Sequence, residues 1–314
     1  MKVVILDAGT LGADLPLTPI TESFETAVYT GTASDEVESR IADCDVIIVN
    51  KIKLNESNLS KTNAKLICIT ATGYDNIDVA YCRKKGIAVC NVVGYSSASV
   101  AQCTAAMALS LSCRLSDYTE YVSNGEYEKS GVANHLVPPF YELEGKTWGI
   151  IGLGNIGKRV ARIAEGLSMN VLAFKRTPDE KYNCVSLETL CKTADIISIH
   201  TPLTNETFHL IGEKQLNLMK KSCILINVAR GNVCDEQAVA DAVLSGKIAA
   251  FGADVYSKEP FGKDHPFSKI KHLKNVCLTP HMTWGAYEAR VRCIEEIKQN
   301  ILSFQHGEKR CRVD

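Results

Sequence analysis

The strongest constraint on this chain is a glycine-rich turn between an apolar strand and a helix. Residues 148–151 have the apolar, β-rich character of a buried strand, and residues 156–164 have helical spacing. Gly152 permits a tight turn, Gly154 leaves room for a phosphate, and Gly157 lets the helix pack against the strand. Free N–H groups and the dipole at the start of this helix attract an anion. The turn predicts a site for the pyrophosphate of a dinucleotide, and an ordinary β-to-α turn is the alternative. The residues expected to bind it are Gly152, Gly154, Asn155, Ile156 and Gly157.

The turn after the next strand departs from the usual dinucleotide fingerprint. An acid normally follows that strand and accepts hydrogen bonds from the ribose hydroxyls. Here residues 171–174 are followed by Lys175, Arg176 and Thr177. Two cations and a hydroxyl suit the 2′-phosphate of NADP, so the sequence favours NADPH over NADH. The alternative is a solvated basic turn with the ribose held by backbone groups, which leaves NAD as the cofactor.

Short apolar runs alternate with helical stretches along the chain. This alternation predicts parallel sheets covered by helices on both faces, in an α/β fold. A long helical segment from Ser96 separates two such series, so we expect two doubly wound domains. These are a flavodoxin-like substrate domain at 1–97 plus 288–314 and a Rossmann dinucleotide-binding domain at 98–287. The predicted strands are 3–6, 27–29, 45–49, 65–69 and 87–92, then 148–151, 170–174, 196–200, 223–227, 250–254 and 276–278.

Composition excludes several classes of partner. The chain has 314 residues, of which 46% are hydrophobic, so it can bury more than one core. A formal net charge of −1 gives no reason to expect nucleic acid or an anionic membrane surface as partner. The first apolar run is too short for a signal peptide or a membrane span. Thirteen cysteines without a Cys-x-x-Cys pair indicate buried thiols in a reducing cytoplasm, with no metal site expected.

Polar residues follow three later strands, where ligands gather in open α/β sheets. Arg230 can hold a carboxylate with two hydrogen bonds and stabilise a neighbouring carbonyl as a hydride arrives. Histidine side chains in general titrate close enough to neutral pH to exchange a proton with such an oxygen, so His281 is the candidate acid/base, and Glu259 can orient its ring. Each residue also has a simpler explanation. Arg230 could be a surface charge, His281 a structural histidine and Glu259 a solvated loop acid. Their order after the glycine run favours a redox site.

These segments together resemble the D-isomer-specific 2-hydroxyacid dehydrogenase family over essentially the whole chain. The resemblance is carried by the glycine run and by residues 200–207, 227–231, 252–260 and 279–281. It implies that Arg230 binds the substrate carboxylate, that His281 is the acid/base and that Glu259 pairs with His281. It places Asp254 at the nicotinamide carboxamide. The further cofactor contacts that it implies are Thr201, Pro202, Val228, Ala229, Arg230 and His281.

The same resemblance assigns a substrate loop to the first domain. Residues 71–76 resemble the loop whose backbone N–H groups receive the substrate carboxylate, so the active site is expected in a cleft that closes by hinge motion. Lys51, at a strand end, could also reach the substrate, and a solvated lysine is the alternative. The substrate-binding residues expected are Lys51, Thr72, Gly73, Tyr74 and Arg230.

Within the family, segments 50–51, 95–102 and 142–147 look most like glycerate dehydrogenase, also called hydroxypyruvate reductase. That likeness implies hydroxypyruvate or glyoxylate as the keto acid and glycerate or glycolate as the hydroxy acid. A D-lactate-type 2-keto acid reductase and a non-enzymatic, dinucleotide-sensing corepressor are the alternatives. The family resemblance also implies a homodimer, built by the helix from Ser96 and the irregular segment that reaches Phe140.

Overall fold

A computed structural model describes residues 1–177 and 179–314 and divides the chain into two compact units. Unit 1 comprises Met1–Ser96 and Trp284–Asp314, and unit 2 comprises Ser97–Thr283. The second boundary lies at Trp284, before the residue 288 expected from the sequence. Trp284 and Ala286 explain the difference, because both pack against the hydrophobic core of unit 1.

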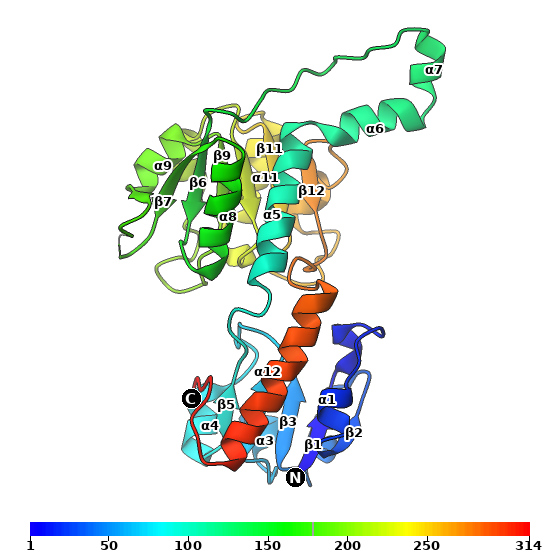
Figure 1. Ribbon diagram of the computed structural model, residues 1–314, viewed down its shortest axis with the longest axis vertical. Coiled ribbons are helices and arrows are strands. Elements are labelled where there is room, and N and C mark those ends of the chain that lie inside the picture. The colour runs from blue at the N-terminus through cyan, green and yellow to red at the C-terminus, as the bar shows by residue number, and fades with distance from the viewer. Residues whose placement is uncertain (178) are drawn as a thin grey trace. The chain divides into compact units, whose positions relative to one another are not determined.

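Unit 1 is built on a five-stranded parallel sheet in the order β2-β1-β3-β4-β5, which is the flavodoxin-like order (Figure 1). Alternate strand residues face two cores, one under α12 and α1 and the other under α2, α3 and α4. The strands are β1 (Lys2–Ile5), β2 (Glu25–Val28), β3 (Val46–Val49), β4 (Leu66–Ile69) and β5 (Ala88–Cys90). The helices are α1 (Thr18–Thr21), α2 (Val37–Arg40), α3 (Glu56–Leu59), α4 (Val79–Lys85) and α12 (Tyr287–Gln305), with a 3-10 turn at Ala8–Leu11.

Unit 2 holds a seven-stranded parallel sheet in the order β12-β11-β10-β9-β6-β7-β8. Counted from β6, this is the doubly wound Rossmann order, which reverses between β6 and β9. The strands are β6 (Thr147–Ile151), β7 (Asn170–Phe174), β8 (Asn183–Cys184), β9 (Ile196–Ile199), β10 (Ile224–Asn227), β11 (Ala250–Ala253) and β12 (Val276–Leu278).

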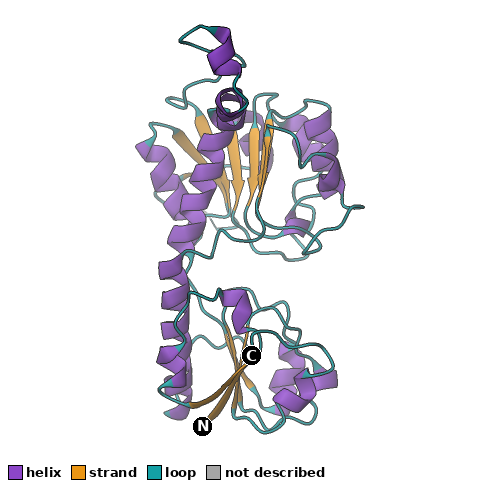
Figure 2. Cartoon of the chain, turned by 90° about the vertical axis from the view of Figure 1, so that its right-hand side faces the viewer, coloured by secondary structure: helices purple, strands orange, loops and turns teal. Residues whose placement is uncertain are grey.

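Helices cover both faces of the unit 2 sheet, and Figure 2 shows them on either side of its strands. Helices α5 and α8 pack against each other and against the sheet on one face, while α9, α10 and α11 bury the core on the other. The helices are α5 (Ser97–Ser112), α6 (Leu115–Ser123), α7 (Glu126–Ser130), α8 (Asn155–Gly166), α9 (Leu187–Thr193), α10 (Glu213–Leu218) and α11 (Glu236–Leu244), with 3-10 turns at Gly231–Val233 and Pro266–Lys269. The predicted pair of doubly wound α/β domains is confirmed.

The described residues also bear on two expectations from composition. Each of the thirteen cysteines is a free thiol, and burial raises the pKa of several, for example that of Cys90 to about 11. Cys103, Cys113 and Cys277 are only half-buried, however. No helix in the described part of the chain is both long and apolar enough to cross a membrane.

Candidate functional site

The glycine-rich turn lies at the carboxyl edge of the unit 2 sheet, beside the reversal between β6 and β9. Gly152 has φ +93°, and a Cβ there would lie 2.7 Å from the backbone of His200 and Thr201. A Cβ at Gly157 would collide with the carbonyl oxygen of Gly152. Both positions therefore require glycine, the first for its backbone angle and the second for close helix packing.

Open space lies over Gly154, at the start of α8. A Cβ there would meet nothing within 4 Å, and no side chain caps the first turn of this helix. The amides of Asn155 and Ile156 belong to that turn, where unsatisfied N–H groups favour an anion. Uncapped amides beside an open backbone fit the pyrophosphate of a dinucleotide.

Two neighbouring strand exits share this edge of the sheet. β9 lies next to β6, and β10 lies next to β9. Thr201 and Pro202 follow the end of β9, whereas Val228 and Ala229 follow β10 directly. Because parallel strands end at the same edge, these four predicted cofactor contacts lie on the glycine side of the sheet.

The basic turn after β7 is partly neutralised by an acid that the sequence reading missed. Asp179 Oδ2 lies 2.7 Å from Nζ of Lys158 and 3.8 Å from Nζ of Lys175. The hydrogen bond from Lys158 is the main cause of the lowered pKa of Asp179. Arg176 and Thr177 are exposed. Among the described residues of this turn, Asp179 thus offsets part of the charge of Lys175.

Arg230 follows β10 on a short turn that Asn227 closes. The Asn227 side chain accepts from the Ala229 N–H at 3.1 Å and donates to the Arg230 carbonyl at 2.9 Å. The guanidinium Nη1 donates to the Ala229 carbonyl at 2.9 Å. Gly231 comes next, and a Cβ there would collide with the backbone of Tyr256 and Ser257. The Arg230 turn therefore packs directly on the loop that leads to Glu259.

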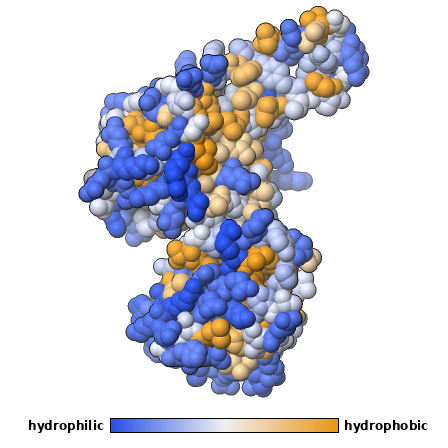
Figure 3. All heavy atoms as spheres, in the orientation of Figure 1, coloured by the Kyte–Doolittle hydropathy of each residue, from blue (hydrophilic) through white to orange (hydrophobic). Residues whose placement is uncertain are grey.

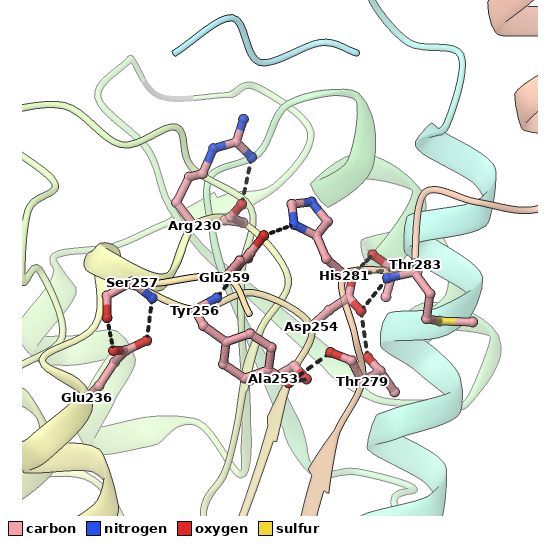
Figure 4. A network of polar contacts seen from close by, with 12 residues as sticks. Arg230, Glu236, Ala253, Asp254, Tyr256, Ser257, Glu259, Thr279, His281 and Thr283 are labelled. Carbon is pink, nitrogen blue, oxygen red and sulfur yellow. Dashed lines mark hydrogen bonds and ion pairs between the residues drawn. The ribbon is translucent and has the colours of Figure 1, made fainter. Parts of the chain in front are cut away.

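Glu259 and His281 are brought together as the sequence predicts. Glu259 Oε2 lies 2.6 Å from Nδ1 of His281, and the two side chains are 32% and 26% exposed. The other carboxylate oxygen accepts from the Tyr256 N–H at 3.0 Å. Figure 4 shows Arg230 and His281 extending to the same side of the Glu259 loop. Because Nδ1 faces the carboxylate, proton exchange with a ligand is expected at the other ring nitrogen, Nε2.

His281 has a backbone conformation that histidine rarely adopts, with φ +53°. The fully buried carboxylate of Asp254 holds the surrounding turn in place. One oxygen accepts from Thr279 Oγ1 and from the Met282 N–H, at 2.6 and 2.8 Å. The other accepts from the N–H and the hydroxyl of Thr283, at 2.9 and 2.6 Å (Figure 4).

These four hydrogen bonds account for the acceptor capacity of the Asp254 carboxylate, which has about four lone-pair sites. The structure thus gives Asp254 a role that the sequence reading missed, as the clamp of the His281 turn. The implied contact of Asp254 with the nicotinamide carboxamide stays a prediction. The threonines at 279 and 283 were a signal for this clamp, because they flank the histidine with hydroxyl donors.

A second histidine at the sheet edge, His200, is unsuited to proton exchange. Its Nε2 lies 2.9 Å from the Ser198 hydroxyl, which also accepts from the indole N–H of Trp148 at 2.9 Å. Burial lowers the pKa of His200 to about 3. The ring is therefore neutral near pH 7, and His281 is the better acid/base candidate.

In unit 1, Lys51 follows β3 on a loop that a buried acid organises. The carboxylate of Asp7 accepts from the Asn50 and Lys51 N–H groups, at 2.9 and 2.7 Å. Asn76 donates from its side chain to the Ile52 carbonyl at 2.8 Å. That bond ties the 71–76 loop to the Lys51 loop, so these two predicted substrate segments are neighbours.

Within the 71–76 loop, the Thr72 hydroxyl donates to the Val92 carbonyl at 2.7 Å. Tyr74 is 40% exposed, and its carbonyl accepts from the Ile77 N–H. Gly73 lies between them. The Thr72 hydroxyl thus supports the loop, and binding of a carboxylate by Gly73 and Tyr74 stays a prediction.

A Rossmann sheet with a glycine cradle and an Arg, Glu and His at its carboxyl edge defines a class, the dinucleotide-dependent oxidoreductases. Residues 105–283, more than half of the chain, match the profile of the D-isomer-specific 2-hydroxyacid dehydrogenase NAD binding domain. The chain belongs to the D-isomer-specific 2-hydroxyacid dehydrogenase family. It is therefore an oxidoreductase that interconverts 2-keto and D-2-hydroxy acids with a nicotinamide dinucleotide.

Relatives span most or all of the chain. It is 41% identical over 251 residues to a glyoxylate reductase of Thermococcus litoralis, covering 78% of this chain and 75% of the relative. It is 35% identical to a hydroxypyruvate reductase of Blautia hydrogenotrophica, covering 98% of both. The crystal structure of a D-lactate dehydrogenase from Aquifex aeolicus with NAD and lactic acid is 32% identical, with a TM-score of 0.86 over 98% of this chain and 96% of that one.

The Asp254 clamp generates a stability prediction. In Asp254→Asn an amide nitrogen replaces one acceptor oxygen and faces buried donors, so the free energy of unfolding falls by about 1–3 kcal/mol. Urea unfolding measures the change. The exposed Asp241→Asn on α11 is the matched control and shifts the free energy by less than about 0.5 kcal/mol. If both variants had the same free energy of unfolding, the buried hydrogen bonds of Asp254 would not contribute to the stability of the fold.

Proposed function

We propose that this enzyme reduces hydroxypyruvate or glyoxylate to D-glycerate or glycolate, with NADPH as the favoured donor. The single observation that carries the proposal is the Glu259–His281 pair at 2.6 Å, on strand exits of a dinucleotide-binding sheet. The choice of substrate is supported by the names of two relatives. Relatives named glyoxylate reductase and hydroxypyruvate reductase are 41% and 35% identical to this chain.

In the proposed reaction, the turn at Gly152, Gly154 and Gly157 would hold the reduced dinucleotide, which would supply the hydride for the carbonyl carbon of the keto acid. Arg230 holds the substrate carboxylate with its planar guanidinium, and its charge favours electron density building on the neighbouring carbonyl oxygen. His281 donates the proton on Nε2 to that oxygen. Glu259 accepts from Nδ1 throughout, which keeps the ring in one orientation.

Substrate contacts from unit 1 are part of the proposal. Lys51 and the 71–76 loop are neighbours through Asn76. Backbone N–H groups of Gly73 and Tyr74 can bind a carboxylate, and the ammonium of Lys51 adds positive charge for an anionic substrate. These contacts concern binding of the keto acid, whereas the chemistry is assigned to unit 2.

The preference for NADPH rests on the turn after β7. No acid directly follows that strand, and Arg176 and Thr177 are exposed there. A guanidinium and a hydroxyl are suited to a phosphate monoester, while an acid at this position would repel it. Asp179 offsets the charge of Lys175, so the preference depends chiefly on Arg176.

A steady-state screen of hydroxypyruvate, glyoxylate, pyruvate and larger 2-keto acids, each with NADPH and NADH, tests this proposal. We expect the highest kcat/KM for hydroxypyruvate or glyoxylate, and a higher value with NADPH than with NADH. A higher value for pyruvate would identify a D-lactate-type reductase. Binding of dinucleotide without turnover of any keto acid would favour the sensing corepressor. A higher kcat/KM with NADH would overturn the role given to Arg176.

The role of His281 has its own test. In His281→Ala no group on this turn can donate the proton, so kcat falls by at least about a hundredfold. Binding of the dinucleotide, measured by fluorescence titration, stays within about twofold of the wild type, because the glycine cradle is untouched. His272→Ala, at an exposed histidine of the same unit, is the control and keeps wild-type kcat. Unchanged turnover in His281→Ala would remove the acid/base assignment.

We also infer a homodimer that uses the segment from α6 to residue 141. This segment extends away from the unit 2 sheet, and apolar side chains gather along it (Figures 1 and 3). Leu136, Val137 and Tyr141 are 74%, 66% and 71% exposed, which is costly for large apolar groups in water. A second copy of this chain would bury them. We also propose a cytoplasmic location, which the thirteen free cysteines support because thiols stay reduced in that compartment.

Light scattering after size-exclusion chromatography checks the dimer. At micromolar concentration the wild type elutes with twice the chain mass, while Leu136→Asp with Tyr141→Asp shifts toward the monomer because two charges enter the apolar surface. Val28→Asp, at a partly exposed apolar residue of unit 1, is the control and leaves the mass unchanged. A monomeric wild type would refute the dimer.

A further inference from the structure

Glu236, the first residue of α11, is a buried acid that the proposed reaction does not use. Its side chain is 7% exposed, as is that of His265, which precedes the 3-10 turn at Pro266–Lys269. Capping of α11 does not require it, because the Asp235 side chain accepts from the first free N–H groups of this helix. The buried carboxylate must therefore serve contacts outside α11.

Two hydrogen-bond donors and one imidazole nitrogen surround the Glu236 carboxylate. The Ser257 N–H donates to Oε1 at 2.8 Å, and the Ser257 hydroxyl donates to Oε2 (Figure 4). Nε2 of His265 lies 2.8 Å from the same Oε2. Buried acids of this kind are stable only when paired and hydrogen-bonded, so each donor matters.

His265 is itself held in one orientation. Its Nδ1 accepts from the Phe267 N–H at 3.2 Å, and its Nε2 lies at ion-pair distance from Glu236. Three aromatic rings enclose the imidazole, with centroids 6.1 Å (Tyr256), 4.9 Å (Phe261) and 5.1 Å (Phe267) away. The imidazole cannot turn away from Glu236 without displacing these rings.

Glu236 thus fixes Ser257, the residue directly after the one whose N–H contacts Glu259. Ser257, bound twice by Glu236, follows Tyr256, whose N–H donates to Glu259 Oε1 at 3.0 Å. The Tyr256 hydroxyl donates to the Thr279 carbonyl at 2.8 Å, two residues before His281. The 256–257 turn is therefore tied to α11 on one side and to both members of the Glu259–His281 pair on the other.

We propose that Glu236, oriented by His265, is a positioning residue that holds the 256–257 turn so that Glu259 faces His281. Its catalytic consequence rests on the function proposed above. Glu236 touches neither substrate nor cofactor in this scheme, and it acts on the reaction only through Glu259. A purely structural role would weaken the fold without any dependence on Glu259.

Glu236→Gln is the first test. Glutamine has nearly the same shape but replaces one acceptor oxygen with a donor nitrogen. Either a Ser257 donor or the nearby His265 nitrogen then faces an amide nitrogen where it faced a carboxylate oxygen. We expect kcat for keto acid reduction to fall between about tenfold and about a hundredfold, as for misplacement of a catalytic group. The KM for keto acid and the affinity for dinucleotide stay within about twofold of the wild type. The matched control, Glu213→Gln, changes an exposed acid at the first position of α10 and keeps wild-type kcat.

A double-mutant cycle distinguishes a positioning role that acts through Glu259 from a general loss of structure. If Glu236 acts through Glu259, Glu236→Gln lowers kcat by less than about twofold in a chain that already carries Glu259→Gln. If its role is only structural, the same factor is lost in both backgrounds. Equal losses, or an unchanged kcat in the single variant, would overturn the proposal.

Amide hydrogen exchange tests, without relying on catalysis, whether Glu236 holds the 256–257 turn. In Glu236→Gln the Tyr256 and Ser257 amides should exchange at least about tenfold faster than in the wild type, because local opening of the turn becomes easier. The Met282 and Thr283 amides, bound to Asp254, should keep their protection. Unchanged exchange at residues 256 and 257 would refute the proposal that Glu236 holds this turn. A wild type that exchanges as expected but reduces no keto acid would refute the proposed function instead.

Discussion

The buried carboxylate of Asp254 is the interaction on which the arrangement of this site depends. His281 has φ +53°, a left-handed conformation that costs about 1–2 kcal/mol for a non-glycine residue. Four hydrogen bonds to Asp254 compensate for that cost, and they come from side chains and backbone on both sides of the histidine. Because Asp254 directly follows β11, the position of the imidazole is fixed by the register of the sheet.

The same device recurs at other loops that carry candidate site residues. Asp7 holds the Lys51 loop through backbone N–H groups, and Glu236 holds the 256–257 turn through Ser257. In each case a buried acid supplies acceptors to a loop whose own polar groups would otherwise be unsatisfied at the end of a parallel strand. Loops at a sheet edge lack a regular ladder, so side-chain acceptors take the place of the next strand.

The fold could be predicted from the sequence because the central strands of both sheets are uninterrupted apolar runs. Strands such as β3, with four consecutive buried residues, leave no other plausible structure, whereas the two-residue β8 has no apolar run and was missed. The glycine turn was predictable for a similar reason, since close approach at Gly152 and Gly157 excludes larger residues. Local sequence is sufficient where one residue type alone satisfies the geometry.

The supporting acids were not predictable in this way. Glu236 reads as an ordinary first-turn acid of an amphipathic helix, and its partner Ser257 is 21 residues away. The partners of Asp254 lie more than 20 residues downstream, so they are defined only once β11 and β12 are paired. From the sequence, Asp179 is expected to be a solvated acid in a loop, and only the structure shows its contact with Lys158 on α8. Pairings of this kind depend on tertiary structure, and spacing along one chain does not reveal them.

Burial distinguishes the acid that faces the histidine from the acids that hold loops. Glu259 is 32% exposed, whereas Glu236 is 7% exposed and Asp254 is fully buried. In the proposed reaction His281 loses one proton per reduced substrate and must regain it from solvent, which requires a pair that water can reach. The loop-holding acids exchange no proton, and burial strengthens their hydrogen bonds by excluding competing water. The site therefore combines solvent access at the proton-transferring pair with buried acceptors that keep this pair aligned.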